Sequence, residues 1–517
     1  MKRPDKTRNY LNTFVKTSIF VFFSIALSKI FTYAYKIIIA RNFGAGVYGN
    51  FSLAIIITGF FVAFASLGFS DGLVRYISYY LGKKDKARIK YFISVTTRLM
   101  LCSGIIGGVL LFFLADIIAV GIFKDSELAV FLKIFSVIVP LSLLGSISIA
   151  FLRSYERAKT ASFLTGIFHN GIRLAIIISL IALGFGMLSV SYSYVLSYAF
   201  VIIAAIYLAK NQLLRVMRSP VTLKNSEKGK LLREIFAYSW PLVLVGLLFS
   251  MFYWIDSLVL GYFTNSETVG FYSAAITLVG LFVMAPDLFS QLFLPVISKE
   301  LSRDNKTVIR TLTKQITRWI YMFNIPIFAI IFFFPGAILN LFFGPIFMVA
   351  QTPLRILALG GMFSGFINTF TNLLSAKKET KLILYDFATF SAVNLMLNVL
   401  LIQYSMTGVA IGTAVSWVGF YFTLFFQIKK KYGFYPMKRN VARVTCVAIV
   451  PLMTLYVMAL FFGQSRSGML ISAGVFGIVY VALLIATKSL DERDWAVVRD
   501  IKDKVARSVT PAVKLAE

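Results

Sequence analysis

The sequence predicts an all-α polytopic membrane protein with about fourteen transmembrane helices, and three observations predict it. Of the 517 residues, 58% are hydrophobic and only 14% are charged, whereas a soluble chain is about one quarter charged. Apolar runs of roughly 20 residues recur from end to end, each long enough to cross about 30 Å of hydrocarbon. Basic residues fall mainly between these runs. A transmembrane barrel would show shorter segments of alternating polarity.

The predicted spans follow one another in three groups. The first six cover residues 13–41, 46–69, 91–115, 128–151, 162–184 and 187–209. The next six cover residues 235–263, 268–292, 314–338, 347–373, 382–403 and 406–428. Two more cover 441–462 and 468–487. The apolar run after the basic start "MKRPDKTRNY" is too long for a signal peptide, so we expect a retained first span.

Alternate links carry most of the positive charge. Eight links hold 44 of the 52 Lys and Arg residues: 1–16, 71–98, 152–160, 210–233, 299–318, 377–381, 429–443 and 488–517. The links between them are short and poor in basic residues, as in "KDSE" and "TNSET". Because basic loops stay in the cytoplasm, both termini are predicted to be cytoplasmic, in the cytoplasmic (inner or plasma) membrane. The net charge of +30 therefore reflects topology, and we expect no nucleic-acid partner.

One basic stretch occurs twice. "ISYYLGKKDKARIK" at 77–90 returns as "ISKELSRDNKTVIR" at 297–310, and Tyr48–Gly59 likewise matches Val269–Gly280. The repeat indicates two homologous six-helix lobes in the same orientation, unless the likeness is one of loop composition alone. Parallel repeats are one architecture of alternating-access transporters, which bind substrate between the lobes.

The repeat sets the predicted domain organisation. An N-terminal six-helix lobe covers 1–209, a basic cytoplasmic linker 210–234, and a C-terminal six-helix lobe 235–428. Two additional peripheral helices follow in 429–487, and a charged cytoplasmic tail covers 488–517.

Ionisable groups within the spans are the first candidates for function, because each costs at least about 2.5–3.5 kcal/mol on insertion scales. The first span holds Lys29, Lys36 and Arg41. The fifth span holds His169 and Arg173, four residues apart and thus on one helical face. These mostly cationic side chains predict a binding site for an anionic head group. For Arg41 the alternative is a side chain that snorkels to the outer membrane edge.

Acidic and amide side chains mark the second lobe. Asp256 aligns with Lys36 in the repeat, so the two form either an ion pair that opens during transport or a static pair between the lobes. Asp256 and Asp386 are the candidate coupling residues for H⁺ or Na⁺. Four amides either line a polar cavity or make helix–helix contacts: Asn368, Asn372, Asn394 and Asn398.

The chain has no features of an enzyme. It lacks the GxxxxGK[ST] phosphate loop, and no link or tail is large enough for a soluble catalytic domain. His169 is the only histidine, which excludes a zinc site built from several histidines. We therefore expect no catalytic residue, no cofactor and no metal site.

One motif resembles a known family. "KIIIARNFGAGVYGNFSLA" at 36–54 is similar to the opening motif of oligosaccharide flippases (Wzx-type O-antigen and polysaccharide translocases) of the multidrug/oligosaccharidyl-lipid/polysaccharide (MOP) superfamily. The matching residues are Arg41, Phe43, Gly44, Tyr48 and Gly49, and the pattern of six, six and two spans is similar over residues 10–490.

The resemblance implies a function. It implies an alternating-access flippase that moves a polyprenyl-(pyro)phosphate-linked oligosaccharide from the cytoplasmic to the outer leaflet for surface polysaccharide biosynthesis. Its partners would be this glycan, membrane lipids and glycan-assembly enzymes. The alternatives are a lipid II flippase and a cation-coupled multidrug exporter of the same superfamily.

Overall fold

The computed structural model describes residues 6–155, 157–218, 223, 225–287, 297, 300–301, 303, 305–437, 440–487 and 489. Most of the predicted tail, part of the linker 210–234, the end of the span 268–292 and part of the second basic repeat lie outside the described residues. All regular structure in the described part is helical. The helices are α1 (Lys6–Ala65), α2 (Phe69–Gly82), α3 (Lys86–Asp116), η1 (Ile117–Ile122), α4 (Ser126–Phe135), α5 (Ile138–Ser154), α6 (Ala158–Phe163), η2 (Leu164–Phe168), α7 (His169–Ala182), α8 (Leu188–Met217), α9 (Asn225–Phe263), α10 (Ser266–Val279), α12 (Lys306–Phe333), α13 (Pro335–Phe342), η3 (Pro345–Ala350), α14 (Gln351–Ala376), α15 (Thr380–Leu401), η4 (Ile402–Tyr404), α16 (Ser405–Tyr432), α17 (Asn440–Phe462) and α18 (Arg466–Ala486).

Twelve segments of the described chain are long and apolar enough to cross a membrane. The two longest exceed twice the roughly 20 residues that one crossing needs: Phe23–Ala65 has 43 residues and Thr380–Tyr432 has 53. The first contains a break at Gly44, whose φ of 81° and ψ of −175° are not helical. The second consists of α15, the short η4 and α16. The chain is therefore an all-helical, multi-pass membrane protein.

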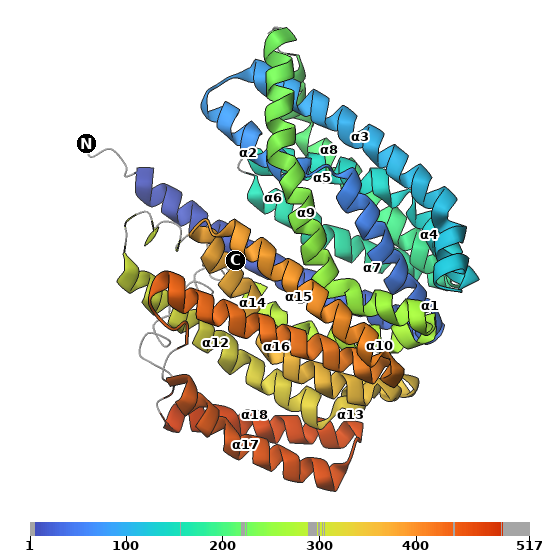
Figure 1. Cartoon of the computed structure of the whole chain (residues 1–517), viewed down its shortest axis with the longest axis vertical. Helices are drawn as coiled ribbons and strands as arrows, with labels where there is room; N and C mark the ends of the chain where they lie inside the picture. The colour runs from blue at the N-terminus through green and yellow to red at the C-terminus, as the bar shows by residue number, and fades with distance from the viewer. Residues whose placement is uncertain are drawn as a thin grey trace, which may run out of the picture.

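The helices form two bundles: in Figure 1, α2–α8 lie in the upper part of the view and α10 and α12–α16 in the lower part, while α9 extends to the top of the view. Helices α1–α8 make up the N-terminal bundle, where Phe51 packs on Phe135 and Tyr194 with ring centroids 6.2 and 5.7 Å away. Helices α9–α16 make up the C-terminal bundle, where Phe252 and Phe387 both pack on Phe420. Helices α17 and α18 pack on each other and against α12 and α13, at the lower edge of the view.

The links lie at two ends of the molecule. We call the end with the links around 83–85, 376–380 and 432–440 the basic end, and the end with the links around 123–126, 264–266, 333–351 and 462–466 the opposite end. The opposite end lies toward the right of Figure 1, near the labels of α1, α10 and α13.

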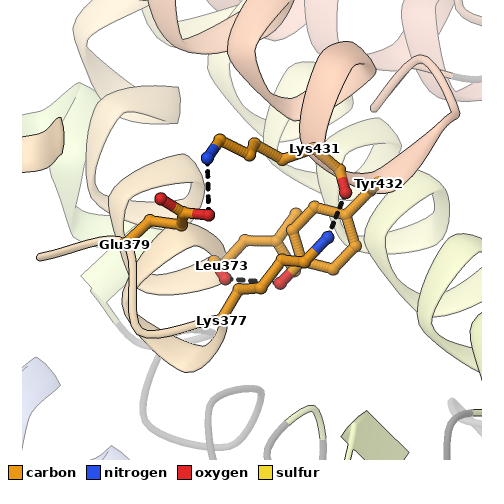
Figure 2. A network of polar contacts seen from close by, with 5 residues as sticks. All are labelled: Leu373, Lys377, Glu379, Lys431 and Tyr432. Atoms are coloured by element: carbon orange, nitrogen blue, oxygen red, sulfur yellow. Dashed lines mark hydrogen bonds and ion pairs between the residues drawn. The ribbon is translucent and has the colours of Figure 1, made fainter.

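Lysine and tyrosine side chains connect the helix ends at the basic end, as Figure 2 shows. Lys431 Nζ pairs with Glu379 Oε1 at 2.6 Å, so the end of α16 holds the start of α15. Lys377 donates to the carbonyl of Lys431, and the Tyr432 hydroxyl donates to the Leu373 carbonyl at 2.6 Å. Cationic side chains beside the C-terminal end of a helix are favourable because the helix dipole is negative there.

The structure differs from the sequence prediction in two connecting regions. The predicted link 71–98 contains helix α2, whose Leu73, Tyr76, Ile77 and Tyr80 are buried. This spacing makes an amphipathic helix, which was assigned to the link because it is short and is followed directly by the basic stretch 83–90. At the opposite end, the last residues of the span predicted at 314–338 belong to a separate short helix, α13, and the first residues of the span predicted at 347–373 belong to the turn η3.

Candidate functional site

An ion pair joins the two bundles. Lys29 Nζ of α1 lies 3.4 Å from Asp287 Oδ2, in the helical residues that follow α10. Asn368 Nδ2 of α14 donates to the other carboxylate oxygen, Asp287 Oδ1, at 3.1 Å. Asp287 therefore links the N-terminal bundle to α14. Sequence reasoning missed Asp287, although an acid inside an apolar run was a sufficient signal.

Lys36 lies seven residues further along α1 on the same face, as predicted from the spacing, and also contacts the C-terminal bundle. Its Nζ donates to Thr277 Oγ1 at 3.2 Å, and Thr277 shares a hydrogen bond of 2.9 Å with the Tyr48 hydroxyl. Two cations in the described part of the chain, Arg173 and Lys29, repel the charge of Lys36. Among the described residues, no carboxylate forms an ion pair with Lys36.

Arg173 is held inside the N-terminal bundle. Its Nη2 donates to Asn170 Oδ1 at 2.6 Å, and its guanidinium lies over the rings of Tyr35 and Tyr194, 4.6 and 5.0 Å from their centroids. Stacking on aromatic rings stabilises a desolvated guanidinium by up to about 2 kcal/mol. The side chain is 6% exposed and has no ion pair with a described carboxylate. It therefore adds a buried, uncompensated positive charge.

His169 shares the predicted face with Arg173 and lies at the start of α7. Its ring packs on Tyr198 with centroids 4.7 Å apart, and Nε2 has no hydrogen-bond partner among the described groups. The five residues before it form a π-helix, Leu164–Phe168. Such π-segments are frequent at functional sites because they change the direction of neighbouring side chains.

Arg41 lies apart from these cations. Its Nε donates to the Phe342 carbonyl at 2.7 Å and its Nη2 to the Leu341 carbonyl. Both carbonyls belong to the last turn of α13, so Arg41 connects α1 to the C-terminal bundle at the opposite end. The structure thus gives Arg41 a main-chain partner, and substrate binding by this residue stays a prediction.

Asp256 is enclosed by donors. Its Oδ1 accepts from the Ser257 backbone N–H at 2.7 Å, and its Oδ2 accepts from the Tyr272 hydroxyl at 3.0 Å. The chain of contacts continues from Tyr272 to Thr413 at 3.4 Å and from Thr413 to Asn394 Oδ1 at 3.4 Å. Asp256 is 2% exposed, and buried carboxylates need such partners to remain in a low-dielectric interior.

The remaining amide and acidic candidates lie on α14 and α15. Asn398 is fully buried, one helical turn after Asn394, and neither of its amide atoms has a hydrogen-bond partner among the described groups. Asp386 Oδ1 accepts from Gln427 Nε2 at 2.9 Å, while its Oδ2 has no partner among those groups. Asn372 is partly exposed, one turn after Asn368 on α14.

The predicted Lys36–Asp256 ion pair is not formed in this conformation. Lys36 bonds to Thr277 and Asp256 bonds to Tyr272, so both charged groups contact α10 instead of each other. A pair formed in another conformation stays a prediction. Within the described residues, two ion pairs connect the bundles: Lys29 with Asp287, and, at the basic end, Arg88 of α3 with Glu227 of α9 at 3.7 Å.

The two bundles touch backbone to backbone at the opposite end. A Cβ atom on Gly49 of α1 would lie 1.7 Å from the Ser266 carbonyl oxygen, and one on Gly270 of α10 would lie 1.9 Å from the Ala45 carbonyl oxygen. These two glycines occupy equivalent positions in the sequence repeat. A side chain at either position would hold the helices apart, so the glycines permit the closed crossing of α1 and α10.

Comparison with known proteins assigns the family. Residues 14–301, more than half of the chain, match the polysaccharide biosynthesis protein family. The chain belongs to this family. It is therefore a transporter of the MOP superfamily and not an enzyme. Residues 241–400 also match the MatE family of the same superfamily.

A curated relative of this polysaccharide biosynthesis family protein is an uncharacterized membrane protein of Methanocaldococcus jannaschii. The two are 27% identical over 205 residues, which are 38% of this chain and 39% of the relative. The matched segment thus spans about two-fifths of the length of that relative.

Solved structures of the superfamily share the fold. A lipid II flippase, MurJ, in an inward closed conformation has a TM-score of 0.69 at 17% identity, covering 92% of this chain and 99% of the other. An inward-facing multidrug resistance MATE transporter has a TM-score of 0.66 at 16% identity, covering 80% and 98%. A MOP transporter from Pyrococcus furiosus, described as having a binding pocket of reversed polarity, has a TM-score of 0.59 at 15% identity, covering 81% and 95%. At these identities the likeness concerns the fold alone.

In the described part of this family member, no three His, Cys, Asp or Glu side chains are grouped closely enough to hold a metal ion. Its candidate site instead consists of two chemically different parts. Positive charges lie on α1 and α7 of the N-terminal bundle, and a hydrogen-bonded acid lies on α9 of the C-terminal bundle.

Proposed function

We propose that this protein is an alternating-access flippase that moves a polyprenyl-(pyro)phosphate-linked oligosaccharide from the cytoplasmic to the outer leaflet for surface polysaccharide biosynthesis. The phosphate groups bind the cations of the N-terminal bundle, and the lipid tail stays in the bilayer. Enzymes that assemble the glycan are the expected partners on the two sides of the membrane.

The observation that carries the proposal is the uncompensated positive charge around Lys36. Lys36 has a hydroxyl as its polar partner, and the charges acting on it, from Lys29 and Arg173, are also positive. Asp287 is bonded to Lys29 and Asn368, so it compensates only part of this charge. A buried ionic group is costly unless it is paired, and a phosphate of the cargo supplies the missing partner.

The membrane potential favours this direction of transport. One elementary charge that crosses 100 mV changes the free energy by about 2.3 kcal/mol. A head group with two negative charges therefore gains roughly 4–5 kcal/mol on leaving a cell that is negative inside. The empty protein must then return to its inward-open state, and this step needs a separate driving force. Uptake of H⁺ or Na⁺ at Asp256, or alternatively at Asp386, is the proposed coupling step.

We infer that the two long segments, Phe23–Ala65 and Thr380–Tyr432, each cross the membrane twice, which makes about fourteen crossings. The breaks at Gly44 and η4 support this count. The proposed organisation is two parallel six-helix repeats, the α17–α18 hairpin at the periphery, and both termini in the cytoplasm. The basic end is then the cytoplasmic end, and the opposite end faces outward.

The test is the location of the lipid-linked glycan. We expect depletion of the protein to leave glycolipid on the inner leaflet, out of reach of an impermeant reagent that modifies the outer leaflet. Wild type should restore labelling, whereas Lys36→Met should lower it at least about tenfold because a charge-assisted contact is lost. Lys133→Met is the matched control, since Lys133 pairs with Asp116 at 2.8 Å away from the site.

The alternatives predict other results. If the protein is a lipid II flippase, its depletion would leave the surface glycan unchanged, and the cell-wall precursor would accumulate on the inner leaflet instead. The match to the MatE family over 241–400 is the observation that favours a multidrug exporter. Normal glycan export together with new sensitivity to cationic drugs would support that function and contradict ours.

A further inference from the structure

A short helix at the opposite end is held by both the peripheral hairpin and the N-terminal bundle. Helix α13, Pro335–Phe342, connects α12 to the turn before α14. Its start and its last turn have different partners, and these partners come from parts of the chain that are far apart in sequence. The arrangement gives the α17–α18 hairpin a connection to α1.

The hairpin holds the start of α13 through one glutamine. Gln464, in the turn between α17 and α18, accepts from the backbone N–H groups of Gly336 and Ala337 at 3.0 and 3.2 Å. Its Nε2 donates to the carbonyl of Phe333, the last residue of α12, at 3.0 Å. The first N–H groups of a helix have no partner within the helix. One amide side chain thus fixes the direction in which α13 leaves α12.

The same turn also contacts the far end of α13. Arg466 Nη2 donates to the carbonyl of Asn340 at 3.2 Å and to its side-chain oxygen. The α17–α18 turn therefore contacts both the first and the last part of this eight-residue helix. Two side chains of the hairpin turn, Gln464 and Arg466, thus hold α13 in place.

Arg41 of the N-terminal bundle binds the last turn of the helix that the hairpin positions. Its two bonds, to the carbonyls of Leu341 and Phe342, join a cation to the negative end of α13. The Tyr48 ring stacks on Phe343 directly after α13, with centroids 6.1 Å apart. These contacts lie beside the crossing of α1 and α10, and they require α13 to be in its observed position.

We propose that the α17–α18 hairpin, through Gln464 and Arg466, positions α13 as a latch that Arg41 engages when the two bundles are closed at the opposite end. The inference rests on the proposed alternating-access function. Removing the Gln464 contacts leaves α13 free to tilt, and the two carbonyls no longer face Arg41. The α17–α18 hairpin thus affects the closed contact between the two bundles, although its own helices are not part of that contact.

The test measures the separation of the bundles without any substrate. Spin labels are placed at Glu127→Cys and Glu267→Cys, two exposed positions at the opposite end, in a chain with Cys102 and Cys446 replaced by alanine. Pulsed EPR distances in lipid vesicles give the ratio of open to closed molecules. We expect Arg41→Ala to raise this ratio about tenfold, since two charge-assisted hydrogen bonds are lost, and Gln464→Ala to raise it at least about threefold.

Two further variants separate the latch from a general loss of packing. Gln464→Glu keeps an acceptor for the N–H groups of α13 and places a negative charge at its positive end, but it loses the donor to the Phe333 carbonyl, so we expect a ratio between those of the parent and Gln464→Ala. Gln464→Ala should add nothing in the Arg41→Ala background, because both residues act through α13.

The matched controls are Arg355→Ala and Gln403→Ala. Arg355 also donates to a carbonyl at this end, that of Phe332 at 3.0 Å, but within the C-terminal bundle. Gln403 is an exposed glutamine in η4. Both variants should keep the parental ratio.

Three results would overturn the latch: an unchanged ratio in Gln464→Ala, an effect that adds fully to that of Arg41→Ala, or equal effects in the two controls. The EPR result is independent of transport. A shifted ratio in a protein that moves no glycolipid would therefore support the latch and contradict the proposed function. An unchanged ratio in a protein that flips glycolipid would do the reverse.

Discussion

Gly270→Ala is the sharpest perturbation of the contact between the bundles. The new Cβ would lie 1.9 Å from the Ala45 carbonyl oxygen, whereas real Cβ atoms essentially never approach a heavy atom within 3.0 Å. Helices α1 and α10 must therefore move apart by at least about 1.1 Å at this point. Neither partner is a flexible side chain, so no rotamer change relieves the clash.

The magnitude follows from the cost of overpacking. Forcing an additional methyl group into a packed interface costs about 1–3 kcal/mol. If the crossing of α1 and α10 opens during transport, the added methyl group destabilises only the closed state. The ratio of open to closed molecules then rises about 5- to 140-fold. If the crossing is permanent, the same cost appears as a lower free energy of unfolding.

Pulsed EPR at Glu127→Cys and Glu267→Cys distinguishes these cases. We expect a new population at longer distance in Gly270→Ala and again in Gly49→Ala, with a small change in melting temperature. Gly474→Ala is the control, because a Cβ at that helical glycine meets nothing within 4 Å. Unchanged distances combined with a melting temperature several degrees lower would show a static interface and refute the gate.

Two other predictions concern the site itself. Lys29→Asp and Asp287→Lys should each lower the amount of glycolipid that reaches the outer leaflet, whereas the double variant, which restores the pair between the bundles with reversed charges, should recover part of it. If each single variant is fully active, the pair has no role in transport. Tyr272→Phe removes a donor from Asp256, and we expect it to lower the free energy of unfolding by about 1–3 kcal/mol and to change the dependence of transport on H⁺ or Na⁺. A parental melting curve and parental ion dependence would contradict the role given to this hydrogen bond.

The helices themselves were largely predictable from the sequence. The span predicted at 441–462 is α17, Asn440–Phe462, and the span predicted at 406–428 lies within α16, Ser405–Tyr432. Such boundaries follow from the length of an apolar run and from the polar groups that end it. Two short helices could not be predicted in this way: α2 is too short and too polar to be a span, and α13 continues an apolar run, so its separation from α12 gives no signal of length or polarity.

Contacts between the bundles were less predictable. Lys29 and Lys36 were placed on one face of α1 by their spacing, and the structure shows both against the C-terminal bundle. Their partners, Asp287 and Thr277, depend on how α10 crosses α1. That crossing is set by Gly49 and Gly270, and a glycine in an apolar run does not reveal which helix approaches it. The repeat alignment paired Lys36 with Asp256, whereas in the structure each of them bonds to α10 instead.

The difference between Lys36 and Asp256 suggests how two similar bundles perform different tasks. The two residues occupy equivalent positions of the repeat, and each has a hydroxyl partner on α10: Thr277 for Lys36 and Tyr272 for Asp256. The Asp256 carboxylate already has hydrogen-bond donors within its own bundle, so it needs no group of the cargo as a partner. Lys36 has no such compensation and lies among cations on the N-terminal side.

An anionic head group that binds at Lys36 changes the hydrogen bond to Thr277 and thereby acts on α10 itself. A proton or a cation that binds at Asp256 acts on the same helix through Tyr272. Helix α10 also forms the glycine crossing at the opposite end. Under the proposed mechanism, cargo binding at Lys36 and ion binding at Asp256 both act on α10, and α10 changes the balance between the open and closed states at the opposite end. The two sites therefore need no direct contact with each other.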